Sequence, residues 1–225
     1  MTPLSFCGAL RCWRIGASLA MKKMLTLIPY TLVLVLMAGA QGCVRLEKSY
    51  PEIQTYGLNV PVPDQGHLTA SSARFSVKLN DFTVGPGFAD RYLAYRTAET
   101  AYETDFYHQF MAAPSAIIQE ECAEWLKNSP LIQFIAGPSL KEAPDYSIEG
   151  KVLELYGDYR NEKTPRAVMK IEFTVSQDSV LVLQQTYSAE VPMDRPSPGL
   201  LTEAWGKGLG RILTGFETDF KNVTP

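Results

Sequence analysis

Apolar and polar residues alternate most clearly between Ala167 and Ser176, where Ala, Met, Ile, Phe and Val occupy every second position. This spacing predicts a β-strand with one buried face and one wet face. Gln177-Asp178-Ser179 is a turn signal, and Val180 to Ala189 form the returning strand. With a long strand over Tyr146 to Tyr159, these segments predict an antiparallel meander of three strands.

The first half of the chain contains shorter strand candidates, separated by turn signals. They are Glu52 to Val60, Arg74 to Asn80, Tyr92 to Arg96, Tyr102 to Phe110, and Leu131 to Ala136. The third and fourth are close enough to pair as a hairpin across residues 97–101. Pro61 and Pro63 disfavour strand pairing in the loop that follows the first candidate.

Two segments have helical spacing. Pro114-Ser115 is a helix-start signal, and Asn128-Ser129-Pro130 ends the segment. Between them, Ile118, Cys122, Trp125 and Leu126 fall on one face. The second helix is predicted over Gly199 to Phe220, with an apolar stripe. The members of that stripe are Leu201, Trp205, Ile212, Phe216 and Phe220.

The order of these elements predicts an α+β fold: a mainly antiparallel sheet covered on one face by two helices. The other, wetter face would be left for a partner. The whole chain has 225 residues, of which 46% are hydrophobic and 20% charged, a balance typical of a globular protein. We expect one domain over residues 52–222.

The first 42 residues differ from the rest because they carry four basic residues and no acidic one. Met21-Lys22-Lys23-Met24 precedes an apolar run, Leu25 to Ala40, in the layout of an export signal. That run is too short and too interrupted to span a bilayer comfortably. Residues 1–20 match no structural element. Either translation begins at Met21 and these residues are not part of the protein, or they form an extended basic region of the signal peptide.

Ala40-Gln41-Gly42-Cys43 resembles the lipobox of bacterial lipoproteins, although that pattern prefers Leu where Ala40 stands. The resemblance implies a signal peptide over 21–42, lipid attachment at Cys43 and a tether over 43–51. Two or three acyl chains hold a protein stably on a bilayer. Val44, which is not Asp, favours the outer membrane by resemblance to enterobacterial sorting. The alternative is an ordinary secretory signal with a chance cysteine.

Candidate catalytic or ligand-binding residues are few. Removal of the signal and acylation of Cys43 would leave Cys122 as the one free thiol, so no internal disulfide is expected. We expect Cys122 to be a small buried side chain. The two histidines, His67 and His108, have no partners at metal-binding spacing. We expect His108 to be structural. No metal, no cofactor and no enzymatic activity are predicted.

Gly206-Lys207-Gly208-Leu209-Gly210 matches neither a dinucleotide fingerprint nor a phosphate loop, and it lies inside a predicted helix. Small residues there would let the helix approach the sheet closely. The formal charge is −3 without a basic run, so nucleic acid is not an expected partner.

Tyrosine and phenylalanine are concentrated between Tyr92 and Phe110. The core can accept only one face of these strands. Tyr92, Tyr95 and Tyr107 are therefore candidates for a partner surface, since aromatic residues are enriched at interfaces. The alternative is a core with scattered exposed tyrosines.

Three segments in this order resemble the auxiliary lipoprotein family of ABC-type transport systems, the lipoprotein component of paraquat-inducible MCE-type systems. They are Gln54 to Leu58, Phe88 to Arg96, and Tyr107 to Pro114. In the third, Phe110 stands where the family usually has Trp, and Gln109 where it has Arg. The resemblance extends over nearly the whole mature chain.

The resemblance implies a non-enzymatic protein that is lipid-anchored at the periplasmic face of the outer membrane. There it would dock the MCE-domain periplasmic protein of an ABC transporter, with phospholipids as cargo. A homo-oligomeric ring would match a cylindrical partner. The alternative is a stand-alone envelope lipoprotein for lipid binding or outer-membrane assembly.

Overall fold

The computed structural model describes residues 51–61, 75–137 and 143–224. The predicted signal peptide, Cys43 and all of the tether except Pro51 lie outside these ranges. Within them, no helix has the length and apolar character needed to cross a membrane.

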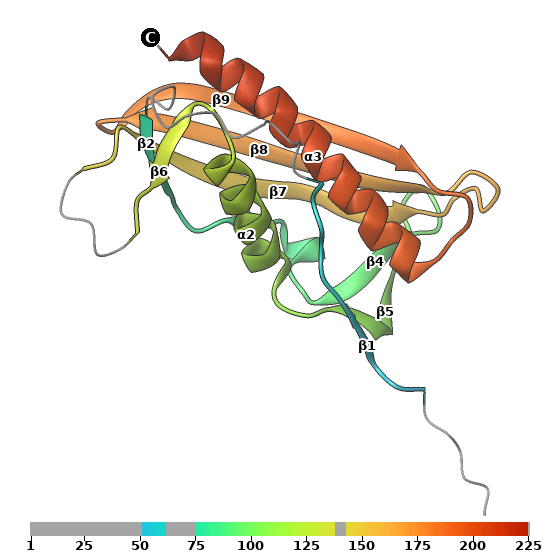
Figure 1. Ribbon diagram of the computed structural model, residues 1–225. Coiled ribbons are helices and arrows are strands. Elements are labelled where there is room, and N and C mark those ends of the chain that lie inside the picture. Colours follow the sequence, from blue (N-terminus) through green and yellow to red (C-terminus); the bar gives the residue numbers. More distant parts are fainter. Residues whose placement is uncertain (1–50, 62–74, 138–142, 225) are drawn as a thin grey trace, which may run out of the picture. The chain divides into compact units, whose positions relative to one another are not determined.

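The predicted meander forms the largest part of the sheet (Figure 1). β7 (Tyr146–Asp158), β8 (Arg166–Gln177) and β9 (Val180–Pro192) pair antiparallel in sequence order. Asp178 and Ser179 connect β8 to β9 with φ of 50° and 68°. Positive φ at both loop residues is the geometry that a tight hairpin turn requires. The meander is confirmed.

The other edge of β7 is paired by three short strands in succession. β2 (Phe75–Leu79), β3 (Thr83–Val84) and β4 (Tyr92–Arg96) all run parallel to it. β6 (Ile132–Ile135) is parallel to β2. The sheet is therefore mixed, and the prediction of a mainly antiparallel sheet was wrong. Alternation shows which face a side chain occupies, but it does not show the direction of the strand. Parallel strands need a long crossover connection, and α2 (Pro114–Lys127) lies in the crossover from β2 to β6.

A hairpin completes the far end of the sheet. β5 (Tyr102–Phe110) is antiparallel to β4, as predicted. β1 (Gln54–Tyr56) is parallel to β5 and covers only three of the nine residues predicted for the first strand. After β1 the chain leaves the sheet, because Leu58 and Val60 are buried in the core and the N–H of Val60 donates to Glu121 on α2.

Both helices lie on one face of the sheet, as predicted (Figure 1). α3 (Pro198–Val223) packs on β8 and β9. Trp205 of α3 is fully buried, stacks on Phe110 and donates its indole N–H to the carbonyl of Val168 at 3.0 Å. Glu217 joins the helices by accepting hydrogen bonds from Trp125 and Ser129.

The glycines of α3 permit close contact, as the sequence predicted, although the nearest neighbour is not the sheet. A Cβ on Gly206 would overlap the carbonyl oxygen of Asn59, in the segment after β1. A Cβ on Gly208 would lie 3.4 Å from Ala189 on β9, an ordinary contact. Cys122 is buried on α2, as expected.

The opposite face of the sheet carries polar side chains along β8 and β9, including Lys170, Glu172 and Thr186. A small apolar cluster interrupts it, formed by Ala94, Tyr156 and Val168 beneath Phe88 of a short 3-10 turn, η2 (Pro86–Phe88). This uncovered face also carries the candidate site.

Candidate functional site

The candidate site is built on the β4–β5 hairpin, where the two strands change register. Leu93 pairs with Asp105, but the preceding residue, Tyr92, pairs with Gln109. The extra residues of β5 form a bulge. The Asp105 carboxylate stabilises it by accepting the backbone N–H groups of Tyr107 at 3.0 Å and His108 at 3.2 Å.

The bulge brings aromatic rings to the uncovered side of the hairpin. Phe106 is 57% exposed, stacks on Tyr92 and meets Tyr107 edge to face. Met111, which follows β5, is 64% exposed. Such exposed large apolar side chains, grouped and rimmed by polar residues, are typical of binding sites.

A second group of rings surrounds Tyr102 of the same hairpin. Tyr102 contacts Phe88 and Tyr156, with ring centroids 6.0 and 5.5 Å away, and Phe88 stacks on Tyr156. The guanidinium of Arg96 lies 5.8 Å from the centre of the Tyr102 ring. We call the two groups together the aromatic surface; it consists of Phe88, Tyr92, Tyr102, Phe106 and Tyr107, and it lies over the buried ring of Tyr156.

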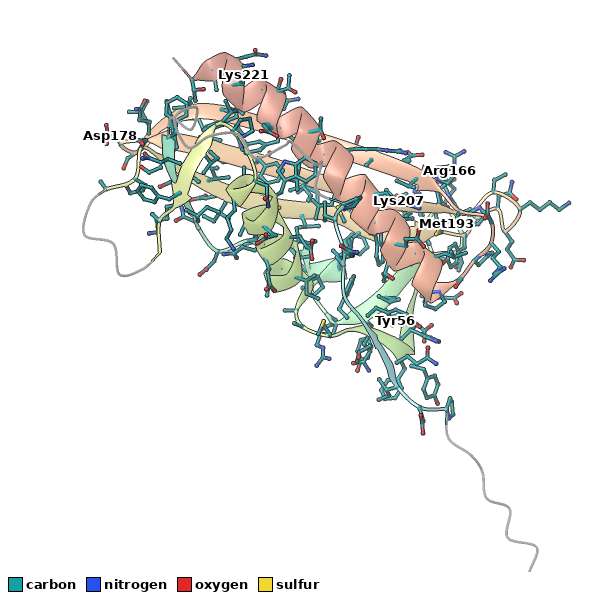
Figure 2. All side chains as sticks on the ribbon, viewed as in Figure 1. Tyr56, Arg166, Asp178, Met193, Lys207 and Lys221 are labelled. Atoms are coloured by element: carbon teal, nitrogen blue, oxygen red, sulfur yellow. The ribbon has the colours of Figure 1, made fainter. Side chains whose placement is uncertain are left out.

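A polar cluster lies on the helix-facing side of the same hairpin. Asp105 Oδ2 accepts the hydroxyl of Tyr95 at 3.0 Å and lies 2.7 Å from His108 Nδ1. The Tyr56 ring lies beside the imidazole (Figure 2 labels Tyr56 on β1), and Tyr159 stacks on Tyr95. The cluster therefore joins β1, β4, β5 and the end of β7.

Hydrogen bonding determines the charge state of this cluster. Burial raises the pKa of Asp105, but hydrogen bonds from His108, Tyr95 and the Tyr107 backbone outweigh it and leave the pKa below its ordinary value. Burial, together with the hydrogen bond to Asp105, raises the pKa of Tyr95. Asp105 is thus an ionised acceptor that holds two backbone N–H groups, a phenol and an imidazole.

An Asp–His pair can orient an imidazole for catalysis, but such use also needs a nucleophile or substrate at the other ring nitrogen. Here Asp105 holds both the His108 ring and the backbone of the bulge, so the pair has a structural role. Among the described residues, no group of three or more His, Cys, Asp or Glu side chains could hold a metal ion.

The structure separates the three predicted partner residues. Tyr92 is half-buried in the stack with Phe106, and Tyr107 is 37% exposed beside it. Tyr95 faces the other side of the hairpin, where its hydroxyl is bonded to Asp105. Whether any of them contacts a partner stays a prediction. Cys43 lies outside the described residues.

Sequence reasoning missed Tyr102 and Phe106 as surface residues. Strict alternation along β5 would place Phe106 on the same strand face as His108 and Phe110. The bulge breaks that alternation, and Asp105, three residues before His108, was its one sequence signal. Tyr156 is buried against Phe88 and Tyr102 through strand pairing that no local pattern reveals.

Comparison with known proteins gives a likeness in fold only. No family model matches the chain, and no curated protein matches it. Protein XCC0632 from Xanthomonas campestris, assigned to family DUF330, aligns with a TM-score of 0.61 and 13% identity over 76% of this chain and 100% of its own. A crystal structure described only as an uncharacterized protein aligns with a TM-score of 0.60 and 12% identity, over 75% and 99%.

Proposed function

We propose that this chain is a membrane-anchored, non-enzymatic lipoprotein that serves as the auxiliary component of an ABC/MCE-type envelope transport system. Its domain docks the periplasmic MCE-domain protein at the outer membrane, with phospholipids as the cargo. The fold shared with the DUF330 protein is compatible with this role.

The observation that carries the proposal is the aromatic surface. Phe106 and Tyr102 are each about half exposed or more. Their contacts with Tyr92 and with Phe88 place them on the side of the hairpin that neither helix covers. Grouped aromatic side chains account for much of the binding energy at protein interfaces. A docking protein needs such an area, whereas the fold itself gains little from it.

The position of the surface relative to the predicted anchor supports the same role. β1 pairs with β5 beside the bulge, so the chain enters the domain next to the aromatic surface. Ile53 is ten residues after Cys43, which allows an extended reach of about 35 Å. An anchor at Cys43 therefore restricts the distance of this surface from the bilayer.

The test is a crosslinked pull-down of the full chain from native membranes, read by mass spectrometry. We expect recovery of an MCE-domain protein together with an ABC ATPase. The double variant Phe106→Ser/Tyr107→Ser should reduce that recovery about 30-fold, the effect of losing about 2 kcal/mol at an aromatic hot spot. Phe134→Ser is the matched control, because Phe134 is 40% exposed on β6, outside the aromatic surface.

Two results would contradict the proposal. Absence of the MCE-domain protein, under conditions that retain the ABC components, removes the transport role. Recovery of assembly or cell-wall proteins instead supports the alternative, a stand-alone envelope lipoprotein.

Lipid attachment is tested separately by Cys43→Ala. We expect the variant to leave the membrane fraction or to persist as an uncleaved precursor. Unchanged membrane association and unchanged electrophoretic mobility would exclude attachment at Cys43.

A further inference from the structure

β9 forms the upper border of the sheet in Figure 1 and pairs only with β8 among the described strands. Its register with β8 is continuous from Leu183 to Pro192. Figure 2 marks the two ends of this border at Asp178, in the turn before β9, and Met193, just after it. Within residues 51–61, 75–137 and 143–224, no strand pairs with the outer backbone groups of this long, regular strand.

This edge lacks the features that natural proteins use to prevent pairing. Exposed edges are usually short or interrupted by Lys, Pro or a bulge. The ten residues from Val180 to Ala189 contain no charged residue, no proline and no glycine. The single register shift lies before Leu183, and Glu190 and Pro192 occur only at the far end.

The covering helix does not protect the middle of the strand either. Gln185 lies on the same face as Tyr187, whose hydroxyl bonds to Asp219 of α3, yet Gln185 is exposed, as are Gln184 and Thr186. Val180 and Leu181, at the start of the strand, are 66% and 57% exposed. The start and the middle of the strand are therefore accessible to another strand.

The length of the edge indicates what could cover it. The other outer strands, β1 and β6, have three and four residues and would leave most of β9 unpaired. The edge formed by β5 carries Glu103 and Asp105 and contains the bulge. Within the described residues, only β9 itself has an edge of matching length, and it carries no charge before Glu190.

We infer that β9 is a self-association surface, on which the β9 strand of a second copy pairs antiparallel to join two sheets into one. Full overlap of Val180–Pro192 with its copy places the two-fold axis at Thr186. This register sets Thr186 opposite itself, Gln184 opposite Ser188 and Leu183 opposite Ala189. Such Thr–Thr, amide–hydroxyl and apolar pairs stabilise antiparallel ladders, and no like charges meet.

Both helices of the second copy stay on the same side of the joined sheet in this arrangement, because directly opposed residues of an antiparallel pair share a face. The contact is isologous and therefore closes at two copies. It does not use the aromatic surface, so it can be tested independently of the proposed function.

Thiol crosslinking of the full chain in membranes tests the register. Thr186→Cys should yield a covalent dimer under mild oxidation or with a short bifunctional thiol reagent. Ser188→Cys is the matched control: it is exposed on the same face, but the register separates it from its copy by about 14 Å, too far for a disulfide. The unsubstituted chain controls for the native cysteines. Equal crosslinking at the two positions, or none at Thr186→Cys, would overturn the register.

The oligomeric state of the detergent-solubilised full chain tests the contact itself. We expect a dimer, and Thr186→Lys should raise its dissociation constant at least about tenfold by placing two like charges opposite each other. Thr174→Lys on β8 adds the same charge to the same face, one strand inward, and should leave the dimer intact. A monomer at all concentrations, a larger ring, or equal dimerisation of the two variants would each overturn the inference.

Discussion

At the residue scale, the candidate site depends on Asp105. Its carboxylate is bonded to the Tyr107 and His108 backbone, to the Tyr95 hydroxyl and to the His108 ring. These bonds hold the bulge that exposes Phe106. One acidic side chain thus links a buried polar cluster to a surface on the other side of the same strand.

We expect Asp105→Asn to lower the free energy of unfolding by about 1.5–3 kcal/mol at pH 7, since hydrogen bonds to a charged group are lost. Because folding lowers the pKa of Asp105, its contribution is present above the ordinary pKa of 3.8 and is lost as pH falls through the folded value. The difference between variant and parent should therefore shrink as pH falls below 3.8. Urea unfolding at several pH values measures this.

Glu103→Gln is the control for that series, because Glu103 is exposed on the same strand. It should change stability little at any pH. A loss for Asp105→Asn that is constant between pH 7 and pH 2.5 would contradict the ionised role of Asp105.

The hairpin turn offers a second residue-scale prediction. Ser179 adopts φ of 68°, a conformation that costs an L-residue energy and glycine little. Ser179→Gly should raise the free energy of unfolding by roughly 0.5–1 kcal/mol, as measured by thermal unfolding. Ser179→Ala, which keeps the strained φ, should give no gain. An equal effect of both substitutions would refute this explanation.

At the scale of elements, α3 is positioned by a backbone contact. Gly206 lies against the carbonyl of Asn59, so any side chain there must displace the segment after β1. Residues 58–60 in turn bury Leu58 and Val60 in the core. The helix therefore holds the first described segment in place, next to the candidate site.

Gly206→Ala should lower the free energy of unfolding by about 2–3 kcal/mol through overpacking against backbone. Gly208→Ala is the comparison within the same helix. Its Cβ would meet only ordinary contacts, and the gain in helix propensity, up to about 1 kcal/mol, should leave stability unchanged or higher. Chemical denaturation measures the free energy of unfolding of the two variants. Equal losses would show that any substitution of a glycine in α3 is destabilising, and that the Asn59 contact is not the cause.

At the scale of the whole molecule, one core connects the two helices to both halves of the sheet. β7 is its central strand, with the antiparallel meander on one edge and three parallel strands on the other. Cys122 lies in that core and is fully buried. Its exposure requires the domain to open.

Cys122 should therefore report global unfolding. Burial, together with the charge of Glu121, raises the pKa of the Cys122 thiol, which further lowers its reactivity. We expect labelling of the Cys122 peptide, followed by mass spectrometry, to be negligible in the native protein and to follow the denaturant transition. Rapid labelling without denaturant would show that α2 opens locally.

Hydrophobic periodicity by itself predicted the meander, the β4–β5 hairpin, and the apolar stripes of α2 and α3, through residues such as Met169, Cys122 and Trp205. Periodicity reflects which side of an element is buried, and that is a local property. The order and direction of strands were decided only by tertiary structure, since parallel pairing of β2 and β4 with β7 depends on crossovers between distant segments. The aromatic surface was also decided only by tertiary structure. Phe106 becomes exposed through the bulge, and the bulge needs the hydrogen bonds from the Tyr107 and His108 backbone to the Asp105 carboxylate.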